Sequence, residues 1–297
     1  MSNSTVSINF NLISTILSAF ADSIAIVICL TFLFIILYHL IQIKYNQYQV
    51  PIDVTLILST NILCVIIIKT TVQTIHVTIP TVLQDFQTNI KYKKTRFCQI
   101  RAYIFYSMVG ILYWSYVLLA LFRFVRIIYP KQIWFHRSSF YLYILIPAQY
   151  IFVFILTLPL LIMFDGLHYI SDEPYCSIVL TPIYPIIYGM IIIFVLPYSA
   201  MCILYLCIAR KMHQMPIVGQ YLRRNRRDYM VIRRMLLNIF ILCIVSIPVF
   251  IIYIIESIYN RSDSLIYRVQ WLLSSLSSCL FSLMLPLITV RLHDLLK

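Results

Sequence analysis

The stretch LYILIPAQYIFVFILTLPLLIMF, residues 142–164, contains no charged side chain. A bilayer core about 30 Å thick is crossed by roughly 20 apolar helical residues, so this stretch is long enough to span a membrane. Residues 25–43 and 235–255 have the same character. These three segments are predicted to be transmembrane helices, and they decide the fold class.

The composition of the whole chain agrees with a membrane protein. Hydrophobic residues make up 62% of the 297 residues, charged residues 11%, and the mean hydropathy is +0.91. A soluble domain is about a quarter charged, so this chain is expected to turn its apolar surface toward lipid. The prediction is an all-α membrane protein, one seven-transmembrane helix bundle over residues 1–297, with helices near 19–42, 53–75, 98–128, 139–163, 183–210, 231–256 and 267–290.

The distribution of positive charge predicts the topology. Seven Lys and Arg residues lie on the side of the N-terminal tail, fifteen on the opposite side, and Lys69 lies within the second helix. Cytoplasmic loops are enriched in Lys and Arg, so the N-terminus is expected outside and the C-terminus inside, in a multi-pass plasma-membrane protein. Two glycosylation sequons, at Asn3 and Asn260, fall on the predicted outer side.

The net charge of +13 would suggest nucleic acid as the partner of a soluble protein. Here eight of the inner positive charges lie between Arg210 and Arg234. Two interpretations fit them equally: a loop held by anionic lipid headgroups, or a contact surface for an acidic cytosolic partner. Nucleic acid is not expected as a partner.

Several residues occur in an order and spacing that is similar to the rhodopsin-like G-protein-coupled receptors. Cys98 opens the third predicted helix, Arg123 follows 25 residues later, and Pro130 seven residues after that. The span from Cys98 to Arg123 corresponds to about 37 Å of helix, which brings Arg123 to the cytosolic face. The resemblance extends to one further tyrosine and three helix prolines: Tyr205, Pro197, Pro248 and Pro286.

The resemblance implies a disulfide between Cys98 and Cys176, tying the second outer loop to the third helix. These are the only two cysteines in predicted outer segments, where the compartment is oxidising. Among the eight cysteines there is no C-x-x-C pair, so a zinc or redox site is not expected. No metal or cofactor is predicted.

The chain departs from the family at several positions. Phe122 precedes Arg123 where the family usually has an acid, and Asn61 takes the place of the second-helix aspartate. The sixth-helix motif is Val245-Ser246-Ile247-Pro248, the seventh is Leu285-Pro286-Leu287-Ile288-Thr289, and Gln149 lies near the position of the fourth-helix tryptophan. A decayed receptor that no longer signals is therefore an alternative. Many members of the family hold a sodium ion with the second-helix aspartate and nearby polar side chains. The corresponding positions here are Asn61, Leu112 and Leu285, so no allosteric sodium site is expected, because sodium requires several oxygen ligands.

The resemblance also constrains the ligand, which would bind between the outer halves of the helices. Phe105 takes the position of the aspartate that pairs with biogenic amines, and the seventh helix has no lysine for a retinal Schiff base. Lys69, Phe105 and Glu256 are the pocket candidates. A basic or amidated peptide is the guess that the outer acids suggest: Asp165, Asp172, Glu173, Glu256 and Asp263.

Lys69 has two interpretations of equal weight. A buried ammonium usually faces a cavity or a partner, whereas a lysine near a helix end can extend to the headgroups. As the one intramembrane charge identified, it gives little support to the rival class, a transporter or channel, in which several such groups are usual. An enzyme is not expected, because no cluster of His, Asp or Glu lies at membrane depth.

Signal transfer is expected at the cytosolic rim. Asp228 lies 20 residues before Pro248, about 30 Å along the sixth helix and near the depth of Arg123. The resemblance implies an Arg123–Asp228 pair in the inactive state, with Tyr205 available to hold Arg123 when the sixth helix moves to admit a heterotrimeric G protein. The alternative is that Asp228 only balances the arginines around it.

Overall fold

The computed structural model describes residues 2–45, 54–86, 96–129, 137–164, 166–170, 173–178, 183–213 and 264–288, together with isolated positions between 240 and 254. Helices account for nearly all of this. Their bounds are α1 (Ser2–Tyr45), α2 (Val54–Gln73), η1 (Thr74–Thr78), α3 (Ile79–Phe86), α4 (Arg96–Ile128), α5 (Ser138–Phe140), η3 (Tyr141–Leu145), α6 (Ile146–Ile162), α7 (Tyr184–Met190), η4 (Ile191–Val195), α8 (Leu196–His213) and α10 (Ser264–Ile288).

Three of the long helices contain a π-helical segment, and each segment ends two residues before a proline: Pro80, Pro147 and Pro197. A proline ring clashes with the carbonyl four residues earlier and provides no N–H group for the helix. That carbonyl lies in the middle of the π segment in all three helices. We attribute the wider π turn to this clash, so α2–η1–α3, α5–η3–α6 and α7–η4–α8 are each one continuous span.

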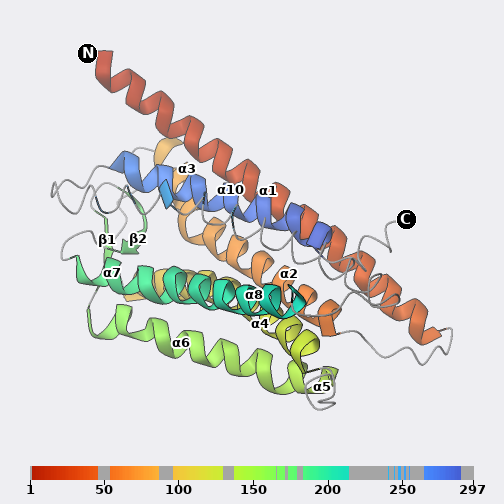
Figure 1. The fold of residues 1–297 in the computed structure, drawn as a ribbon. Helices are drawn as coiled ribbons and strands as arrows, with labels where there is room; N and C mark the ends of the chain where they lie inside the picture. Colours follow the sequence, from red (N-terminus) through yellow and green to blue (C-terminus); the bar gives the residue numbers. More distant parts are fainter. Residues whose placement is uncertain are drawn as a thin grey trace.

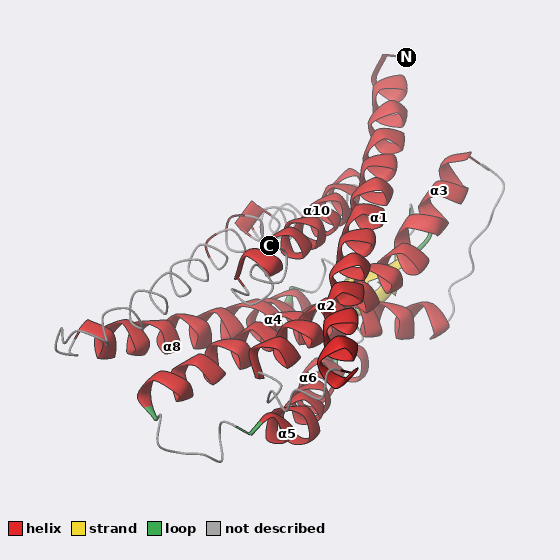
Figure 2. Cartoon of the chain, turned by 90° about the vertical axis from the view of Figure 1, so that its right-hand side faces the viewer, coloured by secondary structure: helices red, strands yellow, loops and turns green. Residues whose placement is uncertain are grey.

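The helix α4 lies at the centre of the described bundle. It packs against α2, α6 and α8, while α1 packs against α2 and α10. Figure 1 shows α1 running alongside α10, and Figures 1 and 2 both show α1 extending beyond the other helices at its N-terminal end. One side of α4 therefore faces the pair α6 and α8, and another faces α2, beyond which α1 and α10 pack together.

Small side chains bring α1 and α10 together. Along α1, Ala21, Ala25 and Cys29 recur at intervals of four residues and are at most 6% exposed. Along α10, Ser278 and Ser282 repeat this spacing and are equally buried. In a membrane, helices gain association energy from close backbone approach, which small residues permit. This explains how two helices from opposite ends of the chain pack along each other.

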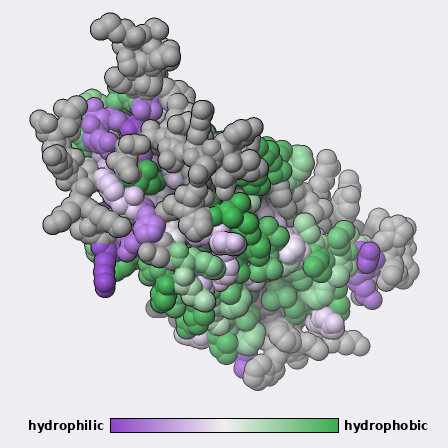
Figure 3. Space-filling model, turned by 90° about the vertical axis from the view of Figure 1, so that its left-hand side faces the viewer, coloured by the Kyte–Doolittle hydropathy of each residue, from purple (hydrophilic) through white to green (hydrophobic). Residues whose placement is uncertain are grey.

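The surface of the bundle is apolar around its middle. Large side chains such as Phe34 and Ile155 are 70% and 62% exposed. Within the described residues, five helical stretches are long and apolar enough to cross a membrane: Asn11–Gln42, Val54–Phe86, Arg96–Ile128, Ser138–Ile162 and Tyr184–Lys211. Figure 3 shows hydrophobic residues across the middle of one face and hydrophilic residues toward its ends.

A short β-hairpin lies between α6 and α7. Its strands, β1 (Leu167–Tyr169) and β2 (Cys176–Ile178), are antiparallel, and Cys176 pairs with Tyr169 in the register. The sulfurs of Cys98 and Cys176 are 2.04 Å apart, so the predicted disulfide is confirmed. It fastens the hairpin to the first turn of α4. We call this end of the bundle the disulfide end and the opposite end the Arg123 end.

The helix bounds differ from the predicted ones in two places. The first helix begins at Ser2 instead of residue 19, and the second continues through η1 and α3 to Phe86 instead of ending at residue 75. In the second case the sequence Thr-Ile-Pro, residues 78–80, resembles a helix end, but the π segment accommodates the proline. The predicted sixth helix, 231–256, lies almost entirely outside the described residues.

The disulfide closes a chain segment of 78 residues. Cross-links of this kind contribute about 2–4 kcal/mol to stability. We therefore expect Cys98→Ser and Cys176→Ser each to lower the melting temperature of the purified protein by several degrees. The double variant should have the same melting temperature as each single variant, because either change removes the same bond. Additive losses in the double variant would contradict a shared bond.

Candidate functional site

Four aromatic rings meet beneath the hairpin at the disulfide end: His76 of η1, Phe105 of α4, Trp271 of α10, and Tyr175, which immediately precedes β2. Each is at most 4% exposed. The ring centroids of Phe105 and Trp271 are 4.7 Å apart and those of Tyr175 and Trp271 5.6 Å, within the range of favourable ring contacts. Burial raises the pKa of the Tyr175 hydroxyl well above its usual value, so this hydroxyl is neutral.

Polar atoms of these rings remain available for a ligand. His76 Nε2 donates a hydrogen bond to the carbonyl oxygen of Cys176 at 2.9 Å, which leaves Nδ1 as an acceptor in the neutral ring. Both His76 Nδ1 and the indole Nε1 of Trp271 are buried without a hydrogen-bond partner. The cluster thus offers one acceptor and one donor inside an apolar setting, as small-molecule sites commonly do.

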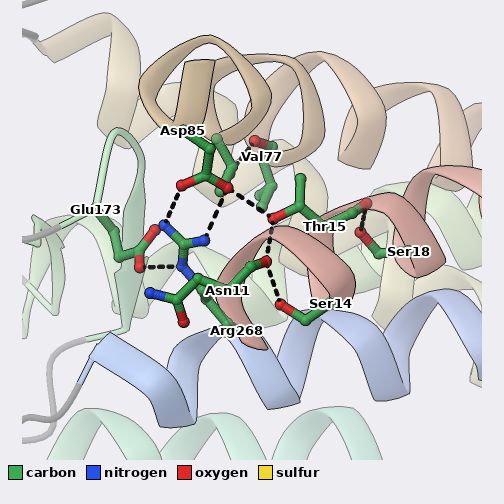
Figure 4. A network of polar contacts seen from close by, with 9 residues as sticks. Asn11, Ser14, Thr15, Ser18, Val77, Asp85, Glu173 and Arg268 are labelled. Atoms are coloured by element: carbon green, nitrogen blue, oxygen red, sulfur yellow. Dashed lines mark hydrogen bonds and ion pairs between the residues drawn. The ribbon is translucent and has the colours of Figure 1, made fainter. Parts of the chain in front are cut away.

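Arg268 of α10 joins the helices and the hairpin loop at the disulfide end. Its Nη1 and Nη2 atoms lie 2.9 and 3.0 Å from the two carboxylate oxygens of Asp85, and its Nε lies 2.6 Å from Glu173. The Thr15 hydroxyl of α1 donates to Asp85 at 3.1 Å. Figure 4 shows these side chains converging from α1, α3, α10 and the hairpin loop. We call Arg268, Asp85 and Glu173 the Arg268 cluster.

A cavity of about 20 Å³ adjoins the Arg268 cluster. It can hold one water molecule, which needs about 10–15 Å³, but no drug-sized ligand. Polar side chains contribute to its lining, but most of the lining surface is apolar. The lining residues are Ser14, Thr15 and Ser18 of α1, Val77, Thr78 and Thr81 of η1 and α3, and Tyr175, Arg268 and Trp271.

Lys69 is buried and does not extend to the headgroups. Its side chain is 2% exposed, and the ammonium donates to α10, with distances of 2.9 Å to the Ser274 hydroxyl and 2.6 Å to the Ser278 hydroxyl. It also lies 5.6 Å from the ring centroid of Phe105, a cation–π distance. Of the two interpretations from the sequence, the geometry is that of a lysine engaged with partners inside the bundle.

Asp22 of α1 is a second buried charge, which was not identified from the sequence. It is 1% exposed and interacts electrostatically with Lys69, although neither of its oxygens accepts a hydrogen bond. Its position inside the predicted first helix, 19–42, was the available signal. Lys69 is thus not the one intramembrane charge that the sequence suggested.

Glu173, one of the acids expected to attract a peptide ligand, is buried. Its side chain is 0% exposed and bonded to Arg268. It is therefore not on the surface to attract a basic peptide. The burial of Glu173 could not be read from a loop sequence, because its partner lies 95 residues away.

At the Arg123 end, Arg123 and Tyr205 lie close enough to interact electrostatically. Tyr205 is 3% exposed and Arg123 is half-buried. Phe122, where the family usually has an acid, is 3% exposed and packs edge-on against Tyr141, with ring centroids 5.3 Å apart. An apolar contact with η3 thus takes the place of a charged side chain beside Arg123.

A neutral polar cluster crosses the middle of the bundle. Asn61 donates to the Ser115 hydroxyl at 3.2 Å and accepts from the Tyr150 hydroxyl at 3.1 Å, and Gln149 donates to the Ser115 hydroxyl at 2.7 Å. Gln149 therefore has a role of its own, linking α6 to α4. Leu112 and Leu285 take the positions of further sodium ligands in the family, and both are buried aliphatic side chains.

Several predicted residues fall outside the part of the chain that the structure describes: Pro130, Asp228, Glu256 and Asn260. Asn3 and Pro286 lie within α1 and α10, where their side chains are not described. Pro248 is one of the isolated described positions and is exposed, and Pro197 lies within α8.

The described helices are those of a multi-pass membrane protein. The profile of the 7 transmembrane receptor (rhodopsin family) matches residues 56–288, more than three quarters of the chain. The chain belongs to this family, and its fold is the seven-transmembrane helix bundle. No curated protein matches the chain.

The Arg268 cluster leads to a stability prediction. Arg268→Gln would leave Asp85 and Glu173 without their cation, and losing one partner of a buried pair typically costs about 3–5 kcal/mol. We expect a clear drop in melting temperature of the purified protein. Arg96→Gln, an exposed cation at the same end, is the matched control and should change little. Equal melting of the two variants would mean that the cluster contributes nothing.

Proposed function

We propose that the protein binds an extracellular ligand at the disulfide end and transmits the signal to a heterotrimeric G protein at the Arg123 end. Membership of the rhodopsin family is the observation that carries this proposal. The charge distribution supports an extracellular N-terminus and a cytoplasmic C-terminus. Binding and signalling of this kind need no bond to be made or broken, only different affinities for two conformations.

The disulfide end has the features that a ligand site needs. The disulfide holds the hairpin over the aromatic cluster, and His76 and Trp271 supply unsatisfied polar atoms there. Fixing the hairpin at two points lowers the entropy lost when a ligand binds beneath it. A ligand larger than a water molecule needs more room than the cavity beside the Arg268 cluster provides, so binding there requires the hairpin or the helix ends to move apart.

The ligand class follows from charges that remain available. A biogenic amine is disfavoured, because Phe105 has no carboxylate and Lys69 brings a positive charge next to its ring. A basic or amidated peptide would have to meet acids other than Glu173, which is bonded to Arg268. The remaining candidates, Asp165, Asp172, Glu256 and Asp263, lie outside the described residues, and the peptide proposal rests on them.

Arg123 is the residue that we propose to meet the G protein. It lies near the end of α4 beside Tyr205, and the loop that follows carries the family's Pro130 position. In the inactive state an acid on the sixth helix, Asp228, would hold it across the bundle. Movement of the sixth helix would then free Arg123, with Tyr205 next to it to fix its new position.

A reconstituted exchange assay tests the function directly. The full chain in lipid nanodiscs should accelerate nucleotide exchange on at least one class of Gα subunit when a neuropeptide library is added. The protein has more buried ionisable groups than the sequence suggested, among them Asp22, Lys69 and Arg268. Groups of this kind are the feature that would favour a transporter. Solute flux into vesicles without any nucleotide exchange would establish that alternative.

Arg123→Ala should abolish exchange while the protein still reaches the cell surface at the parent level. The reason is that the substitution removes the positive charge that we propose to contact the G protein. Arg126, one turn further along α4 and exposed, provides the matched control. Arg126→Ala should retain most of the activity. Loss of activity in both variants would indicate a general effect of positive charge.

Asp228→Ala should raise exchange in the absence of ligand. Surface ion pairs contribute about 0–1 kcal/mol and partly buried pairs more. A change of about 1.4 kcal/mol would shift the ratio of inactive to active protein tenfold, enough to be measured as basal activity. If Asp228→Ala leaves basal exchange at the parent level, Asp228 only balances its basic neighbours.

A further inference from the structure

All three protons of the Lys69 ammonium are directed at α10. Lysine has three N–H donors and no acceptor. In the structure they meet the Ser274 carbonyl at 3.1 Å, the Ser274 hydroxyl at 2.9 Å and the Ser278 hydroxyl at 2.6 Å. Lys69 and Asp22 attract each other electrostatically, but no hydrogen bond joins them. In this arrangement Lys69 fastens α2 to α10.

Asp22 has the opposite situation: it is a strong acceptor without a donor. Both carboxylate oxygens are buried and accept no hydrogen bond. The Ser275 hydroxyl lies near the carboxylate and interacts favourably with it, but the bond that this hydroxyl donates runs to the Trp271 carbonyl at 3.1 Å, and it accepts from Gln73 at 2.7 Å. A buried carboxylate without donors raises the free energy of the fold, so a cation that donates hydrogen bonds to Asp22 would stabilise the protein.

We propose that Lys69 is a two-position switch. In the position of this structure its ammonium binds Ser274 and Ser278 of α10. In the second position the ammonium binds the carboxylate of Asp22 on α1. The flexible four-carbon chain of lysine permits such a move without displacing the backbone of α2.

The serines can release Lys69 without losing the acceptors of their own hydroxyl protons. The Ser278 hydroxyl donates to the Ser274 carbonyl at 3.0 Å, and the Ser274 hydroxyl donates to Gln73 at 3.1 Å. Both bonds exist with Lys69 in place and persist after it leaves. Moving the ammonium therefore exchanges three neutral oxygen acceptors for the charged carboxylate of Asp22 and leaves both serine hydroxyls paired. The two positions can thus be close in energy.

The switch changes which helix α2 holds. With Lys69 on the serines, α2 is fastened to α10 by Lys69 and Gln73; with Lys69 on Asp22, α2 is fastened to α1 and holds α10 only through Gln73. The site lies between the aromatic cluster and the middle of the bundle, because Lys69 also contacts Phe105. A ligand that favours one position would shift the equilibrium by its difference in affinity. This last step, unlike the switch itself, rests on the proposed receptor function.

The test is a distance measurement in nanodiscs between α2 and α10. Labels carried by a non-natural amino acid replace Ile75 and Leu276, which are 50% and 43% exposed, so native cysteines do not react. Asp22→Asn should remove the second position, whereas Ser274→Ala with Ser278→Ala should favour it. Since hydrogen bonds to a charged group are strong, each change should alter the ratio of the two distances about tenfold, in opposite directions.

Two further variants make the result specific. Ser277→Ala is the matched control, because the Ser277 hydroxyl bonds only to the Ser274 carbonyl, at 2.7 Å, and not to Lys69. Lys69→Met, or Lys69→Gln if the first does not fold, should make the distances insensitive to Asp22→Asn. Shifts in the same direction, or none, for Asp22→Asn and the serine double variant would overturn the switch.

The same samples separate this inference from the receptor function. Opposite distance shifts in a protein that never accelerates nucleotide exchange would support the switch and contradict only the proposed function. Normal exchange with unchanged distances would contradict only the switch.

Discussion

A lysine ammonium that is 2% exposed between apolar helices must have all its protons bound, because no water reaches it to compensate. The structure meets this requirement with one helix, α10, whose residues 274–278 include four serines. Gln73, one turn beyond Lys69 on α2, bonds to the same stretch. The position of α10 relative to α2 is thus determined largely by this group of polar contacts. Much of the disulfide end follows from it.

The two sides of the bundle are held by different kinds of interaction. α4 is held against α2, α6 and α8 by apolar packing and by neutral hydrogen bonds such as those of Asn61 and Gln149 with Ser115. α10 is held instead by the Lys69 contacts and the Arg268 cluster, which can rearrange because other acceptors lie within reach. A polar ligand at the disulfide end would compete for the same groups. This division provides a rigid centre and a helix that can change position, as a receptor requires.

The parts of the structure that depend on local sequence could be predicted, and those that depend on distant partners could not. Uncharged stretches such as 142–164 indicate spans by length alone. The Cys98–Cys176 disulfide followed from the resemblance and the compartment, and is confirmed. The burial of Glu173 and the pairing of Lys69 with Ser278 depend on residues about 95 and 209 positions away, beyond the reach of any local pattern. Asp22 was overlooked because an acid near a helix end is usually at the membrane surface.

The central claim is that the Lys69 ammonium and the α10 serines act as one unit. A double-mutant cycle tests it most directly, with thermal melting of the parent protein, Lys69→Met, Ser278→Ala and the double variant in nanodiscs. Residues in direct contact typically show coupling energies of about 0.5–3 kcal/mol. The account predicts that Ser278→Ala lowers the melting temperature of the parent but has little effect once Lys69 is replaced. Strictly additive effects of the two substitutions would contradict it.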